Sequence, residues 1–121
     1  MILRAVHKQP GSFVAPLQDI CSWDRHLNDA SFTHRLATSI SNRGMLNPIL
    51  VMTLEGYLST EQDPSDYLFI DHTKSYVCMI GNNRYLYAKS RGYTHIECLI
   101  VSDPVQLRLM THKLLIKPRK M

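Results

Sequence analysis

Features that would assign the chain to a special class of proteins are largely missing from its sequence. The longest apolar run, residues 48–52, is far too short to cross a bilayer. The N-terminus does not resemble a signal peptide, because Arg4 interrupts its first apolar residues and His7 and Lys8 follow soon after. There is no internal repeat and no low-complexity tract. We therefore predict a soluble, cytoplasmic protein that does not enter membranes.

Cysteine is also scarce, which limits the disulfide and metal chemistry that the chain can support. Its three cysteines, Cys21, Cys78 and Cys98, are odd in number, far apart and never in a Cys-x-x-Cys pair. This pattern indicates neither a disulfide framework nor a zinc site, and we expect the thiols to be reduced. Cys78 and Cys98 stand among apolar residues typical of strands, where a small buried thiol is the expected role.

The six histidines show no paired spacing typical of metal ligands. The dipeptide Asp71-His72 could bind a metal or move a proton if its loop faced a phosphate. Four acidic residues in the same part of the chain could hold magnesium: Glu55, Glu61, Asp63 and Asp66. Because a charged surface loop is usually only hydrated, we predict no metal site.

Length and charge set the remaining bounds. A chain of 121 residues buries enough surface for one hydrophobic core but not for two. The 14 Lys and Arg against 10 Asp and Glu give a net charge of +4, which mildly favours anionic partners such as nucleotides or nucleic acid. Several cations lie near the C-terminus: Lys113, Lys117, Arg119 and Lys120. They could contact nucleic-acid phosphates, although a solubilising tail is the simpler interpretation.

The spacing of apolar residues predicts alternating helices and strands after residue 30. Ser31 can cap a helix whose apolar residues recur every four positions, and Gly44 suits a left-handed stop at its end. The predicted elements that follow are a strand at 49–54 buried on both faces, an exposed loop at 55–75 that could include a short strand at 67–70, a strand at 76–80, a helix at 83–91 ended by Gly92, a strand at 96–101, and a helix that starts at Asp103-Pro104.

These elements divide the chain into three parts. Residues 1–30 are weakly patterned and are predicted to be irregular, residues 31–116 form the domain, and residues 117–121 are a basic tail. The order helix, strand, strand, helix, strand, helix describes a small α/β or α+β domain.

The most informative segment is the turn from the strand at 76–80 into the next helix. A helix start presents unpaired backbone N–H groups and the positive end of the helix dipole, which together suit an anion. Gly81 lets a ligand approach the backbone closely, and Arg84 adds a planar donor suited to phosphate. Asn82 and Asn83 tolerate the turn and supply side-chain amides. Taken alone, the same residues more often form an ordinary helix start that binds nothing.

Two longer blocks of the sequence resemble the ParB/sulfiredoxin superfamily. The first is SISNRGMLNPILV at 39–51, and the second is VCMIGNNRYLYA at 77–88, followed by GYTHI at 92–96. In ParB-like N-terminal domains a helix likewise ends at a glycine before an apolar pair, a proline and a strand, and the second block reads G-E-R-R-x-R-A. Sulfiredoxins carry G-C-H-R at this position. The resemblance covers residues 31–101 and implies an α+β fold with a small mixed sheet and packed helices.

The resemblance further implies a nucleotide site. The superfamily binds the phosphates of CTP or ATP at this glycine-to-helix turn, with help from a hydroxyl on the preceding helix. Carried over to this chain, the binding residues are Ser39, Gly81, Asn82, Asn83 and Arg84, and the cofactor is a nucleoside triphosphate, ATP or CTP, with magnesium. Ser39 stands where sulfiredoxins carry the hydroxyl.

The chain departs from both families at the same turn. Sulfiredoxins need a nucleophilic cysteine directly after the glycine, and Asn82 cannot attack a phosphoryl group, so sulfinic-acid reduction is not expected. Compared with chromosome-partitioning proteins, Asn82 and Asn83 replace a glutamate and an arginine, and Tyr87 replaces a later arginine, which would lower triphosphate affinity. We expect no counterpart of their helix-turn-helix and dimerisation domains, so the chain resembles a stand-alone version such as phages and mobile elements often encode.

Three functions remain open on this basis. The first is a ParB-like domain that binds a nucleotide at residues 81–84 and acts as a weak NTPase or phosphotransferase; no residue is a convincing general base, so its catalytic residues are unassigned. The second is a DNA-binding or nuclease-like accessory protein that uses the basic tail. The third is a catalytically dead module that binds another protein, for which the replaced cysteine and glutamate positions are the only support. The sequence assigns neither the nucleotide nor the oligomeric state.

Overall fold

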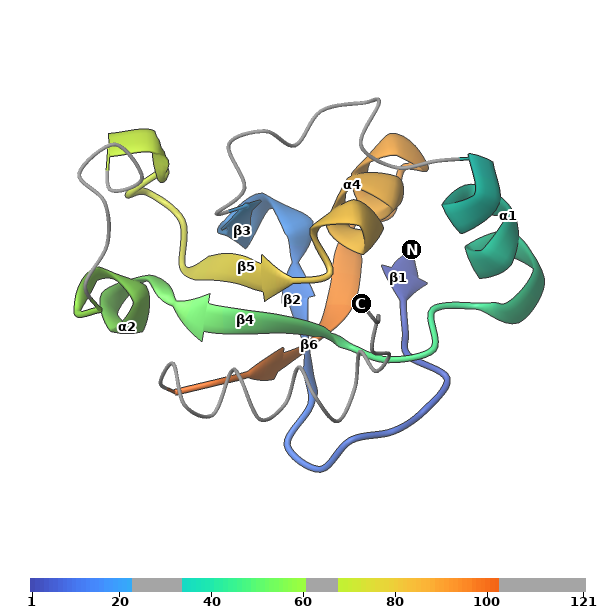
Figure 1. Ribbon diagram of the computed structural model, residues 1–121, viewed down its shortest axis with the longest axis horizontal. Helices are drawn as coiled ribbons and strands as arrows, with labels where there is room; N and C mark the ends of the chain where they lie inside the picture. Colours follow the sequence, from blue (N-terminus) through green and yellow to red (C-terminus); the bar gives the residue numbers. More distant parts are fainter. Residues whose placement is uncertain (23–33, 61–67, 103–121) are drawn as a thin grey trace, which may run out of the picture.

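The strands of the protein form one mixed sheet (Figure 1). The computed structural model describes residues 1–22, 34–60 and 68–102. The strands are β1 (Ile2–Leu3), β2 (Phe13–Pro16), β3 (Ile20–Ser22), β4 (Ile49–Thr53), β5 (Tyr76–Ile80) and β6 (His95–Ile100). Their order is β1-β6-β4-β5-β3, and β2 pairs with β6. Since β4 runs antiparallel to β5 but parallel to β6, the predicted α+β class with a small mixed sheet is confirmed.

The central strand β4 is buried on both faces. Ile49 and Val51 belong to one hydrophobic cluster, and Leu50 and Met52 belong to a second. Each of these four residues is at most 2% exposed. Successive residues of a strand point to opposite faces, so the sheet carries a hydrophobic layer on each side. The prediction of a strand buried on both faces is therefore confirmed.

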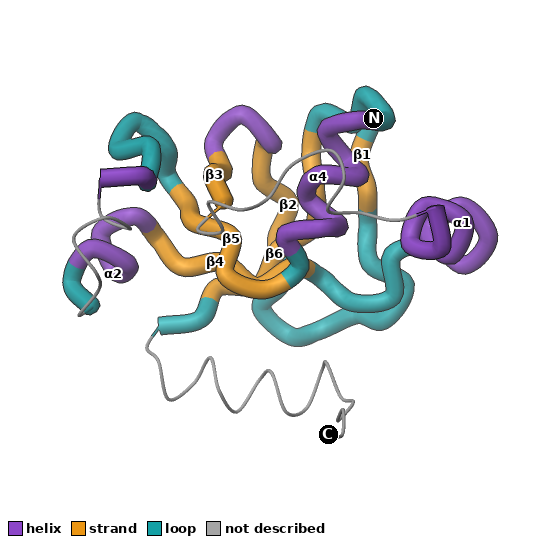
Figure 2. The backbone as a smooth tube through the Cα atoms, turned by 45° about the horizontal axis from the view of Figure 1, so that its top comes forward, coloured by secondary structure: helices purple, strands orange, loops and turns teal. Residues whose placement is uncertain are grey.

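Two helices, α1 (His34–Arg43) and α4 (Asn82–Ser90), cover the same face of the sheet. Figures 1 and 2 show α4 over the strands and α1 beside it at one end. Gly44 follows α1 with a φ of 79°, and Gly92 follows α4 with a φ of 80°, so both predicted glycine stops are confirmed. None of the helices in the three described ranges is long and apolar enough to span a membrane.

A short helix, α2 (Leu54–Leu58), replaces part of the loop predicted at 55–75. The side chain of Thr53 accepts a hydrogen bond of 3.0 Å from the N–H of Gly56, and Tyr57 is buried in the second cluster. A helix of five residues is too short to show helical periodicity in sequence. The strand suggested at 67–70 is also wrong for residues 68–70, which form no strand, while residue 67 lies outside the described ranges.

The N-terminal segment differs from the prediction that residues 1–30 are irregular. Its described part contributes β1 and β2, which pair with β6, and β3, which pairs with β5. These strands have two to four residues each, too few for an alternation of apolar and polar residues to be recognised. They form because distant strands offer backbone partners, which sequence periodicity does not report. The helix expected from Asp103 and the tail at 117–121 lie outside the described residues.

Glu97 of β6 ties this segment to the sheet. Its buried carboxylate accepts hydrogen bonds of 2.8 Å from the N–H of Ala5 and 2.8 Å from the hydroxyl of Ser12. The ammonium of Lys8 lies 3.6 Å away. Burial opposes ionisation of this group, but the two hydrogen bonds and the nearby cations outweigh it, and they hold the pKa of Glu97 below its usual value.

We expect the substitution Glu97→Gln to lower the free energy of unfolding at neutral pH by about 1–3 kcal/mol, since it removes charge-assisted hydrogen bonds. Because the folded-state pKa of Glu97 is depressed, its contribution to the free energy of unfolding is fully present at pH values above its ordinary pKa of 4.5. This contribution is lost as the pH falls through the folded-state pKa. Urea titrations at several pH values should therefore show that the free energy of unfolding falls less steeply with decreasing pH in the variant than in the wild type. The exposed Glu55 offers a control, Glu55→Gln; an equal loss in both variants would contradict the anchoring role.

Candidate functional site

The site suggested by the sequence is the turn between β5 and α4. The strand ends at Ile80, Gly81 adopts a left-handed conformation with a φ of 97°, and α4 begins at Asn82. Gly81 is the N-cap of the helix, and it supplies no side-chain oxygen to the first N–H groups of α4. The positive end of the helix dipole lies at the same point, so the helix start favours a negatively charged ligand.

Glycine is required at position 81 for two separate reasons. A side chain at a φ of 97° would be strained. In addition, a Cβ atom there would lie 2.7 Å from Nη2 of Arg84 and 2.8 Å from Cγ2 of Ile49, both closer than real Cβ contacts. The guanidinium of Arg84 therefore packs directly against the turn, in space that only glycine leaves open.

Arg84 is held at the turn by a backbone contact. Its Nη1 donates a hydrogen bond of 2.7 Å to the carbonyl of Asn47, in the segment that leads into β4. Desolvation lowers the pKa of Arg84, although an arginine stays protonated at neutral pH. Within the described ranges no carboxylate lies at ion-pair distance from this guanidinium. The turn thus carries a positive charge that the described part of the protein does not neutralise.

The other predicted residues differ in how they are placed. The side chain of Asn82 accepts a hydrogen bond of 2.6 Å from the hydroxyl of Ser22 and donates one of 3.4 Å to the carbonyl of Met79, so it connects the helix start to β3. Asn83 is exposed. Ser39 is half-buried on α1, the helix that contacts α4 through the hydroxyls of Ser41 and Tyr87, 3.4 Å apart.

A cavity of about 460 Å³ lies between α4, β3 and the segment at 69–74. It is lined by Ile20, Cys21 and Ser22 of β3, by Phe69, Asp71 and Lys74, and by Tyr85, Leu86 and Lys89 of α4. Sequence reasoning missed this cavity and also the role of Asn47. Most of the lining comes from β3, where the sequence predicted no strand, and from the segment at 69–74, of whose lining residues the sequence had singled out only Asp71 as a candidate functional residue.

The chemistry available elsewhere in the described residues is limited. Cys78 and Cys98 are fully buried, as predicted, and burial raises the pKa of Cys98 to about 12. In the parts of the chain that the structure describes, no group of three His, Cys, Asp or Glu residues could hold a metal ion. Asp71 accepts hydrogen bonds from the N–H and the hydroxyl of Thr73, which lower the pKa of Asp71. An ionised carboxylate of this kind is a poor proton donor.

Comparison with known structures identifies the fold. The chain is similar to the C-terminally truncated chromosome-partitioning protein ParB from Caulobacter crescentus complexed with CTP-γ-S, with 19% identity, a TM-score of 0.52, and coverage of 90% of this chain and 56% of that one. It is also similar to sulfiredoxin from Arabidopsis thaliana, with 24% identity, a TM-score of 0.50, and coverage of 83% and 96%. The chain therefore spans little more than half of the ParB chain.

The comparisons by sequence found no counterpart: no family model matches the chain, and no curated protein does. The structural likeness nevertheless shows a ParB/sulfiredoxin-like fold and confirms the resemblance seen in the two sequence blocks at the level of the fold.

Two glycine substitutions separate backbone strain from crowding at the turn. Gly92→Ala places a methyl group in open space, so only its positive φ opposes the change, and we expect a loss of about 1 kcal/mol in unfolding free energy. Gly81→Ala adds the contacts with Arg84 and Ile49, and we expect a loss of roughly 2–4 kcal/mol. Urea denaturation measures both. Equal losses would mean that neither Arg84 nor Ile49 crowds position 81.

Proposed function

We propose that the protein binds a nucleoside triphosphate and holds its phosphates at the turn between β5 and α4. The observation that carries this proposal is the guanidinium of Arg84, fixed beside the start of α4 with no ion-pair partner among the described residues. A positive charge next to a helix N-terminus favours an anion, and phosphate suits the planar arginine donor. The ParB structure similar to this chain is a complex with CTP-γ-S, which supports the same class of ligand.

Each residue of the turn has a distinct role in this proposal. The first N–H groups of α4 and the guanidinium of Arg84 would bind phosphate oxygens, and Gly81 would keep the approach open. The exposed amide of Asn83 and the hydroxyl of Ser39 would add further donors, while Asn82 holds the helix start against β3. ATP and CTP are both candidates. Magnesium would accompany the nucleotide, bound to its phosphates.

Any reaction at the turn would depend on positioning and charge neutralisation. None of the four residues at 81–84 is a general base, and Asn82 is not a nucleophile. Slow hydrolysis or transfer of the terminal phosphate would therefore rest on the donors that hold it, which is how phosphoryl transfer is largely catalysed.

The substitution Arg84→Gln tests the proposal. A glutamine amide can still donate to the carbonyl of Asn47 but carries no charge, so we expect the affinity for CTP or ATP with magnesium to fall about tenfold or more. Isothermal titration calorimetry measures this change. The control is Arg91→Gln, at the far end of the same helix, which should leave affinity unchanged. Equal affinity in the wild type and in Arg84→Gln would refute the proposed site.

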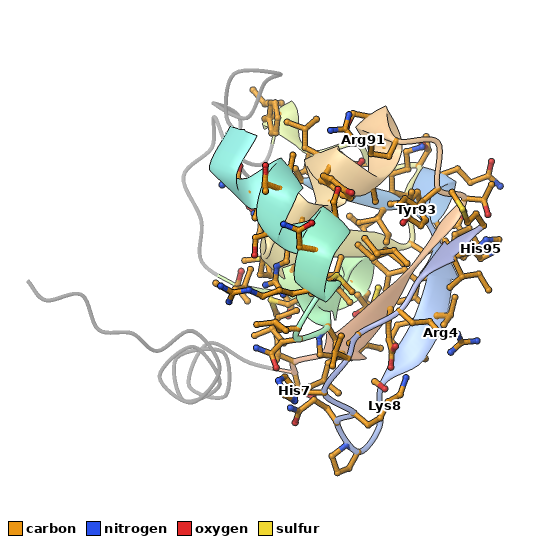
Figure 3. All side chains as sticks on the ribbon, turned by 90° about the vertical axis from the view of Figure 1, so that its right-hand side faces the viewer. Arg4, His7, Lys8, Arg91, Tyr93 and His95 are labelled. Atoms are coloured by element: carbon orange, nitrogen blue, oxygen red, sulfur yellow. The ribbon has the colours of Figure 1, made fainter. Side chains whose placement is uncertain are left out.

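A second candidate function is nucleic-acid binding on a basic face away from this turn. Figure 3 shows Arg4, His7 and Lys8 together with Arg91, Tyr93 and His95 on one side of the molecule. Arg4, Lys8 and Arg91 are exposed, although Glu97 lies 3.6 Å from Lys8 and offsets part of its charge. Such a face suits the phosphate backbone of a nucleic acid without selecting a sequence. The basic tail suggested for this role from the sequence lies outside the described residues.

This candidate predicts a salt dependence that substitutions at the face reduce. Each phosphate contact contributes about −0.9 to the slope of log K against log salt concentration, so the double variant Arg4→Gln/Arg91→Gln should flatten the slope by up to about 2. Fluorescence anisotropy with a labelled DNA duplex measures the slope. The matched control, Lys74→Gln/Lys89→Gln, removes two cations that line the cavity instead. The same slope in both double variants would exclude the face as the binding surface.

A further inference from the structure

The cavity of about 460 Å³ beside α4 has no role in the phosphate site itself. We infer that it receives the nucleoside, the ribose and base, of the nucleotide whose phosphates bind at the turn. This inference rests on the proposed function and adds a second subsite to it. The volume lies within the range of about 300–1,000 Å³ that small-molecule pockets occupy.

The cavity lies beside α4 and next to β3, and its lining on that helix starts one residue after Arg84, at Tyr85. Ser22 lines it, and the hydroxyl of Ser22 donates a hydrogen bond of 2.6 Å to the side chain of Asn82, the first residue of α4. Leu86 and Lys89 line it further along the same helix. An α-helix rises 1.5 Å per residue, so these positions lie about 6 and 10 Å along the axis from Asn82. A nucleotide bound by its phosphates at the helix start can therefore reach into the cavity with its nucleoside.

The lining suits an aromatic base with polar edges. Phe69 is 45% exposed although it is a large aromatic residue, and it lines the cavity together with Leu86 of α4. Any base can stack on an aromatic side chain, and such stacking contributes substantially to binding. The two lysines of the lining are held in position. Lys74 donates a hydrogen bond of 2.7 Å to the carbonyl of Gln18, and the ammonium of Lys89 lies over the ring of Tyr85, 5.3 Å from its centre.

A second cavity, of about 350 Å³, does not meet the same conditions. It is lined by Pro16, Gln18, Tyr93, Thr94 and His95, which lie beyond the C-terminal end of α4. A ligand whose phosphates bind at the N-terminal end of that helix would have to pass along its whole length to enter this cavity. Of the two, the cavity lined by Ser22 lies nearer to the start of α4, because Ser22 is hydrogen-bonded to Asn82.

Neighbouring residues provide a matched pair of variants for the test. Phe69 lines the cavity, while Leu68 beside it is 79% exposed and does not. We expect Phe69→Ala to weaken binding of CTP or ATP about fivefold or more, and to leave binding of inorganic tripolyphosphate, which has no nucleoside, unchanged. Leu68→Ala should change neither. Calorimetry on the full chain measures all of these affinities, and thermal unfolding checks that both variants are folded.

Cys21 reports occupancy of the cavity independently of affinity. Its thiol lines the cavity and is half-buried, whereas Cys78 and Cys98 are fully buried and should react with a maleimide much more slowly. Saturating CTP or ATP should slow the labelling of Cys21 several-fold, as read by mass spectrometry, and tripolyphosphate should not. Labelling is best done under mildly alkaline conditions, because burial raises the pKa of this thiol.

The outcomes distinguish a failure of the nucleoside subsite from a failure of the phosphate site. If the nucleotides bind with equal affinity to wild type and Phe69→Ala and leave the labelling of Cys21 unchanged, the nucleoside lies elsewhere and this inference is overturned, while the phosphate site stands. If neither the nucleotides nor tripolyphosphate bind, the proposed function fails and the inference fails with it. Nucleotide-specific protection of Cys21, together with the loss in Phe69→Ala, supports both.

Discussion

The contact on which the candidate site depends is the packing of Arg84 against Gly81. The guanidinium lies where any other residue at position 81 would place its Cβ, and it is held by the carbonyl of Asn47. One side chain thereby joins the start of α4 to the segment before β4, across 37 positions of sequence. The start of α4, Gly81 and Arg84 therefore depend on one another. Gly81 leaves the space that the guanidinium of Arg84 fills, and this guanidinium fixes the start of α4 to the segment before β4.

The likeness to ParB and to sulfiredoxin is one of fold, and the residues at the turn show why activity does not follow from it. In this chain the side chain of Asn82 accepts a hydrogen bond from the hydroxyl of Ser22 in β3, so this position has a structural role. An amide at this position is not a nucleophile, whereas the proposed binding through backbone N–H groups and Arg84 does not need one.

How much the sequence could predict depended on how local each signal was. The strands β4 and β5, the helix α4 and the stops at Gly44 and Gly92 follow from runs of apolar residues and from glycine conformation, and all were predicted correctly. Short strands such as β3 have no local signal, because they form only against partners elsewhere in the chain. The cavity was missed for the same reason, since Phe69 and Ser22 meet α4 only after folding.

The attachment of the N-terminal segment to β6 also has a consequence during synthesis on the ribosome. Glu97 binds the N–H of Ala5 from 92 positions away, and β1 and β2 find their partner only in residues 95–98. The segment is thus secured only after the ribosome has translated its partner strand, which follows it much later in the chain. Until then the nascent chain exposes unpaired strand edges, a state in which proteins are prone to aggregate and in which chaperones act.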